Sequence, residues 1–204
     1  MKCEKLSLSG LCKIFGTSDF DQAKVLFEQG RIQAAKGRFK GLSRRSKLDP
    51  HTRALCSAWY AKCELAHRRI KSTKSIRIAL KAYQEASKLE QRSRDPNYHA
   101  IAVYCAEQGE LYISITGQPK QAAEAFQWAI SNEAGHHKNE DRNYVSLSDW
   151  CEKTGDCLMK IKAWENAKKF FDDAKQNEKN RGAKFDTDVL NRLDTKIEGC
   201  ELHL

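Results

Sequence analysis

A pattern of small and aromatic positions repeats four times along the chain. Its copies are Ala35-Phe39-Leu42, Ala79-Tyr83-Ala86, Ala122-Phe126-Ala129 and Ala167-Phe171-Ala174. Successive alanines are 44, 43 and 45 residues apart, and the spacing i, i+4, i+7 places each trio on one face of a helix. Because such a unit cannot bury its apolar face alone, the pattern predicts helical repeats that stack on one another.

Glycine and proline mark the expected turns between helices. Gly30 ends a first helix, and a second helix runs from Ile32 toward Leu48 before Asp49-Pro50. The predicted repeats cover residues 18–49, 50–94, 95–138 and 139–182, and residues 183–204 are expected to form a capping helix with a polar outer face. The predicted fold class is therefore all-α, a single α-solenoid domain over 1–204 that winds four helix pairs into a right-handed superhelix.

The small residues at the expected helix crossings, Gly109 and Gly155 among them, and the aromatic residue four positions after each alanine resemble the tetratricopeptide repeat. These repeats are about ten residues longer than the usual period of that family. In length they resemble the long-helix relatives, such as the soluble attachment proteins of vesicle fusion.

Three stretches carry a closer resemblance. They are Ala58-Trp59 with Ala61-Lys62-Cys63, Gly117-Gln118-Pro119 leading into Ala122, Phe126-Gln127 and Ala129, and Gly155-Asp156-Cys157 with Ala167 and Phe171. Over roughly residues 20 to 180 the chain resembles the family of the forty-kilodalton huntingtin-associated protein, the factor VIII intron 22 protein. That resemblance implies an all-helical protein that binds between the large helical-repeat arms of huntingtin and stabilises them, in the cytoplasm, with a link to early endosomes.

Charge is distributed unevenly along the chain, whose formal net charge is +9. Residues 1–95 hold 22 Lys and Arg against 9 Asp and Glu, whereas residues 96–204 hold 14 against 18. The candidate basic patch for partner binding consists of Arg44, Arg45, Arg53, Lys62, Arg68 and Arg69. Clustered cations suit an acidic protein surface, nucleic acid or anionic lipid headgroups. The neighbouring aromatic residues fall at core-like positions, which does not favour stacking on single-stranded bases.

An acidic trio is the main candidate for chemistry. Asp149, Glu152 and Asp156 are spaced i, i+3, i+7 and share a helix face, as an acid pair or a cation site would require. In the tetratricopeptide register this face lines the groove, so we interpret it as a recognition surface. The expected groove residues are Tyr104, Glu107, Leu111, Asp149, Glu152 and Asp156.

No other pattern indicates catalysis, a metal or a cofactor. His136-His137 lies in an expected polar loop without a third ligand nearby, and the eight cysteines contain no C-x-x-C pair. Unpaired cysteines of this kind are typical of a reducing compartment inside the cell, the cytoplasm or the nucleus. The chain also has no uninterrupted apolar run long enough to span a membrane.

From these features we expect a non-enzymatic scaffold that forms a heteromeric complex with a large protein. By resemblance, huntingtin is one possible partner. Two alternatives stay open at this point. One is a nucleic-acid-binding repeat module that uses the basic first half. The other is a membrane-fusion adaptor like the soluble attachment proteins.

Overall fold

Helices account for most of the residues that the structure describes. The computed structural model describes residues 17–66, 72–114, 118–136 and 141–204. Within these ranges the α-helices are α1 (Thr17–Glu28), α2 (Ile32–Ser43), α3 (Pro50–Ala66), α4 (Thr73–Gln91), α5 (Tyr98–Ser114), α6 (Pro119–His136), α7 (Tyr144–Lys160), α8 (Trp164–Lys179) and α9 (Thr187–Glu201). The same ranges contain no strand, and the all-α prediction is confirmed.

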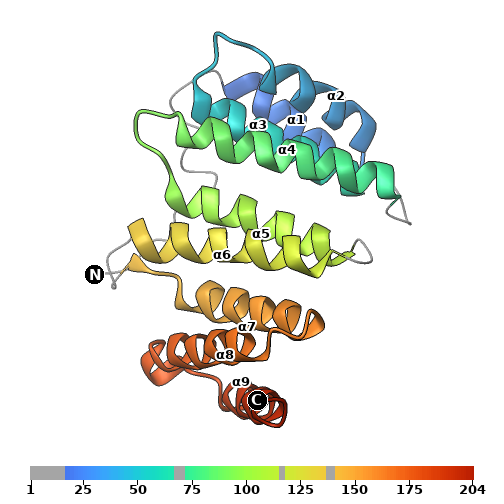
Figure 1. The fold of residues 1–204 in the computed structure, drawn as a ribbon. Helices are drawn as coiled ribbons and strands as arrows, with labels where there is room; N and C mark the ends of the chain where they lie inside the picture. Colours follow the sequence, from blue (N-terminus) through green and yellow to red (C-terminus); the bar gives the residue numbers. More distant parts are fainter. Residues whose placement is uncertain (1–16, 67–71, 115–117, 137–140) are drawn as a thin grey trace. The chain divides into compact units, whose positions relative to one another are not determined.

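The chain forms two compact units that meet within α4, at Ala82 and Tyr83. In the first unit α1 packs on α2 and α2 on α3, while the Ser57 hydroxyl of α3 donates to the Ala82 carbonyl of α4 over 2.9 Å. In the second unit α5 to α9 lie side by side in chain order (Figure 1). The predicted helix pairs and the additional last helix are therefore present, and the assignment of 1–204 to a single domain stays a prediction.

The end of α2 differs from the expectation. The helix ends at Ser43 and does not continue toward Leu48. Its last turn tightens, because Arg44 N and Arg45 N donate to the carbonyls three residues earlier. Asp49 then begins α3 by accepting a hydrogen bond from Thr52 N over 2.9 Å, a role that requires a non-helical residue before Pro50.

The last helix, α9, has the polar outer face expected of a cap. Asp186 precedes it and accepts hydrogen bonds from Asp188 N at 2.9 Å and Val189 N at 3.4 Å. Leu193 and Cys200 are fully buried against the preceding helices. The exposed side chains of α9 are Thr187, Asp188, Asn191, Arg192, Thr195, Glu198 and Glu201. A terminal helix of a stacked array needs this polarity because no further repeat covers it.

The repeated trios form the core of each helix pair. Their alanine and aromatic members are buried, and Phe39, Phe126 and Phe171 have no exposed surface. The rings pack against small residues of the neighbouring helix. A Cβ atom built on Gly109 would lie 2.7 Å from Phe126, and one built on Gly155 would lie 2.5 Å from Phe171. Both distances are shorter than atoms allow, so only glycine permits this approach of α5 to α6 and of α7 to α8.

In three of the helix pairs, a buried glutamate forms a hydrogen bond with the residue just before the following helix. Glu90, Glu133 and Glu178 are at most 2% exposed, and each lies eleven residues after the alanine of its repeat. Their carboxylates accept the backbone N–H of Asn97 at 2.9 Å, of Asn143 at 2.9 Å and of Asp186 at 2.6 Å, respectively. The three donor residues immediately precede α5, α7 and α9, so each glutamate fixes where the next repeat begins.

His99 adds a titratable contact to the second of these junctions. Its Nδ1 lies 2.8 Å from Glu133 Oε2, the oxygen not used by Asn143. The hydrogen bond to Glu133 raises the pKa of His99 above its ordinary value, against a smaller opposing effect of partial burial. Protonated His99 therefore stabilises the fold more than neutral His99 does.

We predict that Gly155→Ala lowers the free energy of unfolding by about 1–3 kcal/mol, because its Cβ must displace the Phe171 ring. Gly199→Ala is the matched control, since a Cβ at Gly199 meets no atom within 4 Å. Urea denaturation of both variants measures the difference. Equal stability of the two variants would contradict the close-packing interpretation.

We further predict that His99 contributes stability that depends on pH. Its pKa is raised in the folded state, so its contribution is complete below the unfolded-state value near 6.5 and disappears as pH rises through the folded-state value. The stability difference between the wild type and His99→Gln should therefore be larger at acidic than at alkaline pH, as measured by denaturation across that range. With Glu133→Gln as background, this dependence should vanish. A difference that grows toward alkaline pH would refute the assignment.

Candidate protein-binding surface

Two lysines occupy one register position in the first helices of successive repeats. Lys153 of α7 and Lys196 of α9 each lie ten residues after the residue that caps the helix, Asn143 and Asp186. Each ammonium group reaches back to carboxylates of the preceding first helix. We call these contacts the charge ladder, defined by Lys153, Lys196, Arg192 and their acidic partners Glu110, Asp149, Glu152 and Asp156.

The first rung of the charge ladder joins α7 to α5. Lys153 Nζ lies 2.5 Å from Glu110 Oε1 and 2.8 Å from Asp149 Oδ2. It also stands 6.0 Å from the centre of the Phe126 ring, within the range of a cation–π interaction. Partial burial favours the neutral amine, but the hydrogen bonds to both carboxylates outweigh it and raise the pKa of Lys153.

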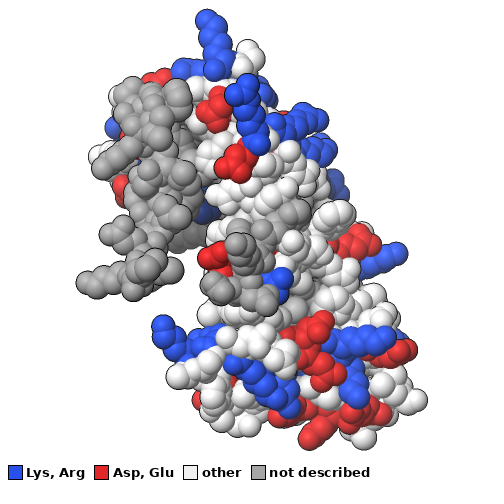
Figure 2. Space-filling model, turned by 90° about the vertical axis from the view of Figure 1, so that its left-hand side faces the viewer, with Lys and Arg blue, Asp and Glu red and all other residues white. Residues whose placement is uncertain are grey.

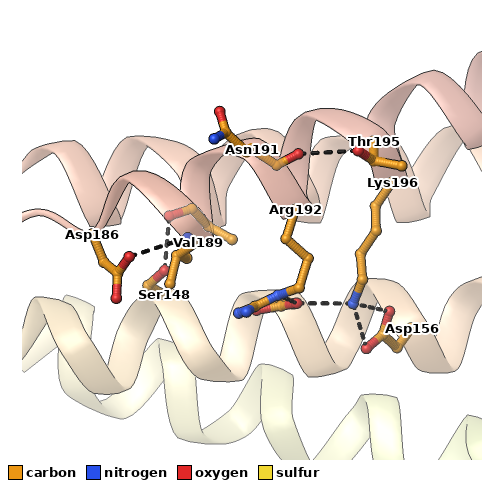
Figure 3. Close-up of polar contacts among 10 residues, drawn as sticks. Ser148, Asp156, Asp186, Val189, Asn191, Arg192, Thr195 and Lys196 are labelled. Atoms are coloured by element: carbon orange, nitrogen blue, oxygen red, sulfur yellow. Dashed lines mark hydrogen bonds and ion pairs between the residues drawn. The ribbon is translucent and has the colours of Figure 1, made fainter.

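The second rung joins α9 to α7 (Figure 3). Lys196 Nζ points toward Asp156, 2.6 and 2.8 Å from its two oxygens, and lies 2.8 Å from Glu152 Oε1. Arg192 contacts both oxygens of Glu152 at 2.8 Å, and Lys196 stands 5.3 Å from the centre of the Phe171 ring. Partial burial raises the pKa of Glu152, yet the hydrogen bonds from Arg192 and Lys196 together bring it below its ordinary value.

Three of the predicted groove residues belong to the charge ladder, and two others are buried in the interior. Asp149, Glu152 and Asp156 do share one face of α7, and cations of this chain bind all three. Tyr104 and Leu111 are only 7% and 3% exposed, which leaves little of either side chain for a partner to contact. Partner binding by these residues stays a prediction.

Glu107, the remaining predicted groove residue, is half-buried on α5 near the hydroxyl of Tyr83. Burial first, and then the negative charge of Glu107, raise the pKa of that hydroxyl. The tyrosine thus remains neutral beside the carboxylate at physiological pH.

The predicted basic patch is partly engaged in contacts within the first unit. Arg45 Nη1 pairs with Asp19 Oδ2 at 2.7 Å, and Arg53 Nε donates to the Ser43 carbonyl at 3.1 Å. Lys62 Nζ stands 5.2 Å from the centre of the Trp59 ring. Two further predicted members, Arg68 and Arg69, lie outside the described residues.

Arg44 belongs to a cluster that the sequence did not reveal. It is exposed and lies close enough to Tyr60 for its charge to act on that hydroxyl, although burial and Glu64 dominate and raise the pKa of Tyr60. Lys40 is exposed in the last turn of α2, with its Nζ 5.8 Å from the centre of the Tyr60 ring. We call Lys40, Arg44 and Tyr60 the α2–α3 cluster. Neither cation forms an ion pair within the described part of the chain.

Figure 2 shows how positive and negative residues are distributed over one face of the molecule. In the part of the view that holds α1 to α4, Lys and Arg predominate. In the part that holds α7 to α9, Lys and Arg lie beside Asp and Glu. Ion pairs therefore satisfy many cations of the second unit, and the basic excess is concentrated on the first.

Sequence reasoning missed Lys40, Lys153, Arg192 and Lys196. A signal existed for the two lysines of the charge ladder, because they are 43 residues apart, the same step as the repeat. Asp149 lies four residues before Lys153 in the same helix. The other carboxylate partners of these lysines lie 40 to 44 residues away in the chain, so spacing within one helix could not identify those pairs.

The described residues contain no group of three potential metal ligands. Burial is the main cause that raises the pKa of Cys63 to about 11 and that of Cys151 to about 12, so these thiols are protonated at neutral pH and poor nucleophiles. His137 lies outside the described residues. In the ranges the structure covers, no helix combines the length and the apolar character that crossing a membrane requires.

Comparison with known proteins identifies the fold. No family model and no curated protein matches the chain. BtubC (BKLC) from P. vanneervenii is similar in structure, with a TM-score of 0.63 at 11% identity over 89% of this chain and 69% of that one. The nearly identical TPR-like repeats of a kinesin light chain-like protein from Podosopora anserina reach 0.61 at 12% identity, over 91% and 84%.

The chain has a tetratricopeptide-like helical repeat fold. At these identities the likeness establishes the fold alone. The resemblance to tetratricopeptide repeats is thereby confirmed, and the resemblance to the huntingtin-associated family stays a prediction.

We predict that Lys196→Met lowers the free energy of unfolding by about 1 kcal/mol, because it removes the ammonium shared by Glu152 and Asp156. The pKa of Glu152 should rise at the same time, as carboxyl NMR titration would measure. Lys169→Met is the control, since Lys169 pairs with Glu165 on an exposed face and should cost less than about 0.5 kcal/mol. An unchanged Glu152 titration would contradict the proposed geometry.

Proposed function

We propose that this protein is a non-enzymatic scaffold that binds and stabilises a large partner protein. The observation that carries the proposal is the α2–α3 cluster, where Lys40 and Arg44 are exposed beside the Tyr60 ring and form no ion pair with a described residue. The nearby Glu64 is buried and pairs with Lys36. Elsewhere, in α7 and α9, comparable cations have carboxylate partners within the chain. A cationic surface left uncompensated in this way is available to an acidic partner.

The composition of the α2–α3 cluster suits a protein interface. Arginine and tyrosine are enriched at the centres of such interfaces, because each presents a large contact area together with hydrogen-bonding groups. Charge steers the encounter, and the ring with the aliphatic stems of Lys40 and Arg44 supplies apolar area once the partner is bound. The tetratricopeptide-like fold supports the same conclusion, since it generally serves protein–protein interaction.

Huntingtin is the partner that the sequence resemblance implies, and we propose it as the first candidate. The complex would be heteromeric, with this chain bound between the helical-repeat arms of the larger protein. The same resemblance supports a cytoplasmic protein with a role at early endosomes. BtubC and the kinesin light chain-like repeats support the fold of this proposal and leave the identity of the partner open.

Nucleic acid is the main competitor for the basic surface. Binding of single strands needs rings on which bases can stack. In the first unit, the Phe39 and Trp59 rings stack on each other, with centres 5.5 Å apart and planes inclined by 23°. Phe20 and Phe27 meet Trp59 edge-on. These rings are engaged in the core, which favours a protein partner.

We predict that Lys40→Glu with Arg44→Glu reduces recovery of the major partner from cells about tenfold or more, because two attractive contacts become repulsive. Affinity purification with mass spectrometry measures the recovery. The control carries Lys162→Glu and Lys184→Glu, two exposed cations of the second unit, and should retain the partner. Recovery of huntingtin with the wild type and the control would support the finer proposal. Recovery of nucleic acid in place of a protein partner, or of no protein partner by the wild type, would refute the scaffold proposal.

A further inference from the structure

The outer face of α4 carries an uncompensated row of cations. Lys74, Arg77 and Lys81 are all exposed and are spaced i, i+3, i+7, so they follow one face of the helix. We call these three residues the basic row. None of them forms an ion pair with a described residue, and the first acidic residue of α4 is Glu85, beyond the row.

This arrangement works against the stability of α4. Like charges three and four residues apart on a helix repel each other, at a cost of a few tenths of a kcal/mol per pair. Lys74 also lies in the first turn, where the partial positive charge of the helix N-terminus disfavours a cation. No acidic residue lies in the first turn of α4 to offset this charge, and the same is true of α2, α3, α5, α6 and α7.

Local electrostatics that oppose folding are often found where a surface has a function. An anionic ligand along the basic row would remove the repulsion between the three cations and would also complement the N-terminus of α4. Binding of an anionic ligand at this face would thus relieve the repulsion that destabilises the unbound chain. The ligand must follow a line, because the row is one helix face wide and spans about 10 Å.

We propose that the basic row docks an acidic helical segment of the partner protein. This inference rests on the proposed function and identifies the chemistry of one contact. Carboxylates on one face of a helix, at i, i+3 or i+4 and i+7, repeat with the spacing of Lys74, Arg77 and Lys81. Two helices that lie side by side can therefore pair all three cations in register.

Other anions fit the basic row less well. A membrane surface gains about 1 kcal/mol per adjacent Lys or Arg, and the row offers three cations with no exposed large apolar side chain among them to insert. Ile76 and Leu80 of the same helix are buried in the core. A nucleic acid would find three phosphate contacts and no aromatic residue on which a base could stack.

The experiment compares two triple variants of the full chain. One carries Lys74→Glu, Arg77→Glu and Lys81→Glu, and the control carries the same change at Lys120, Lys162 and Lys184, which are exposed lysines of the second unit. The probe is a labelled synthetic helix with glutamates at i, i+4 and i+7. Single-stranded oligothymidine and phosphatidylserine vesicles are tested in parallel.

We expect the wild type and the control to bind the acidic helix, and the row variant to bind it about tenfold or more weakly. Binding should weaken as salt concentration rises. The row variant should melt within about 2 °C of the wild type, because a carboxylate at position 74 complements the N-terminus of α4 while like charges still repel along the row. Nearly unchanged thermal stability together with weaker binding separates a docking role from a structural one.

Several results would overturn the inference. They are equal binding of the acidic helix by the row variant and the wild type, or binding of only oligothymidine or vesicles through the row. If the row variant loses helical content, the triple glutamine variant replaces it and must show the same loss of binding.

Purification from cells separates this inference from the proposed function. If the row variant keeps the partner that the Lys40 and Arg44 variant loses, the scaffold proposal stands and the docking role of the row is wrong. If the wild type recovers no partner, the scaffold proposal fails, and the acidic-helix titration still decides whether the row binds such a segment.

Discussion

The structure depends on the contact between an aromatic ring of one helix and a glycine of the helix before it. Phe126 lies against Gly109 and Phe171 against Gly155, closer than any Cβ would permit. The rings have a second role, because Lys153 and Lys196 stand over the same two rings. One packing contact therefore sets the spacing of a helix pair and the position of the charge ladder beside it. A change at the ring would disturb both, since ring packing and cation placement share the same atoms.

Buried glutamates supply the second constraint, which acts between repeats. A carboxylate deprived of water is tolerated only where donors surround it, and Glu90, Glu133 and Glu178 each take a backbone N–H at the start of the next helix. Arg181 also pairs with Glu178, and His99 with Glu133, so the carboxylates receive side-chain donors as well. The corresponding position of the first repeat is Ser46, and there Asp49 begins α3 through its own side chain. The junction after the first helix pair thus uses a local contact where the later junctions use a distant one.

The sequence was sufficient for features that repeat with the helical period, and insufficient for those that depend on distant partners. The trios around Phe39, Phe126 and Phe171 were predicted correctly because apolar periodicity reports burial directly. The glutamates recur eleven residues after the alanine of the last three repeats. A glutamate on a helix is normally interpreted as exposed, however, and only the backbone donor explains its burial. The face of Glu152 was predicted, but its partners Arg192 and Lys196 are at least 40 residues away. The end of α2 was misplaced because its tightened last turn has no signature in the apolar pattern.

The two units differ in whether their exposed cations form ion pairs, and this difference affects the binding energy that each unit could contribute. In the second unit Lys153, Arg192 and Lys196 are neutralised by carboxylates of the chain, so a partner would have to break existing pairs before making new ones. In the first unit Lys40 and Arg44 carry charge that no described carboxylate neutralises, and the same holds for the three cations of the basic row. Repulsion among such cations raises the free energy of the unbound state and is relieved when an anionic surface approaches. Under the proposed function, an acidic partner would therefore gain more from these cations of the first unit, because it would not have to break existing ion pairs to contact them.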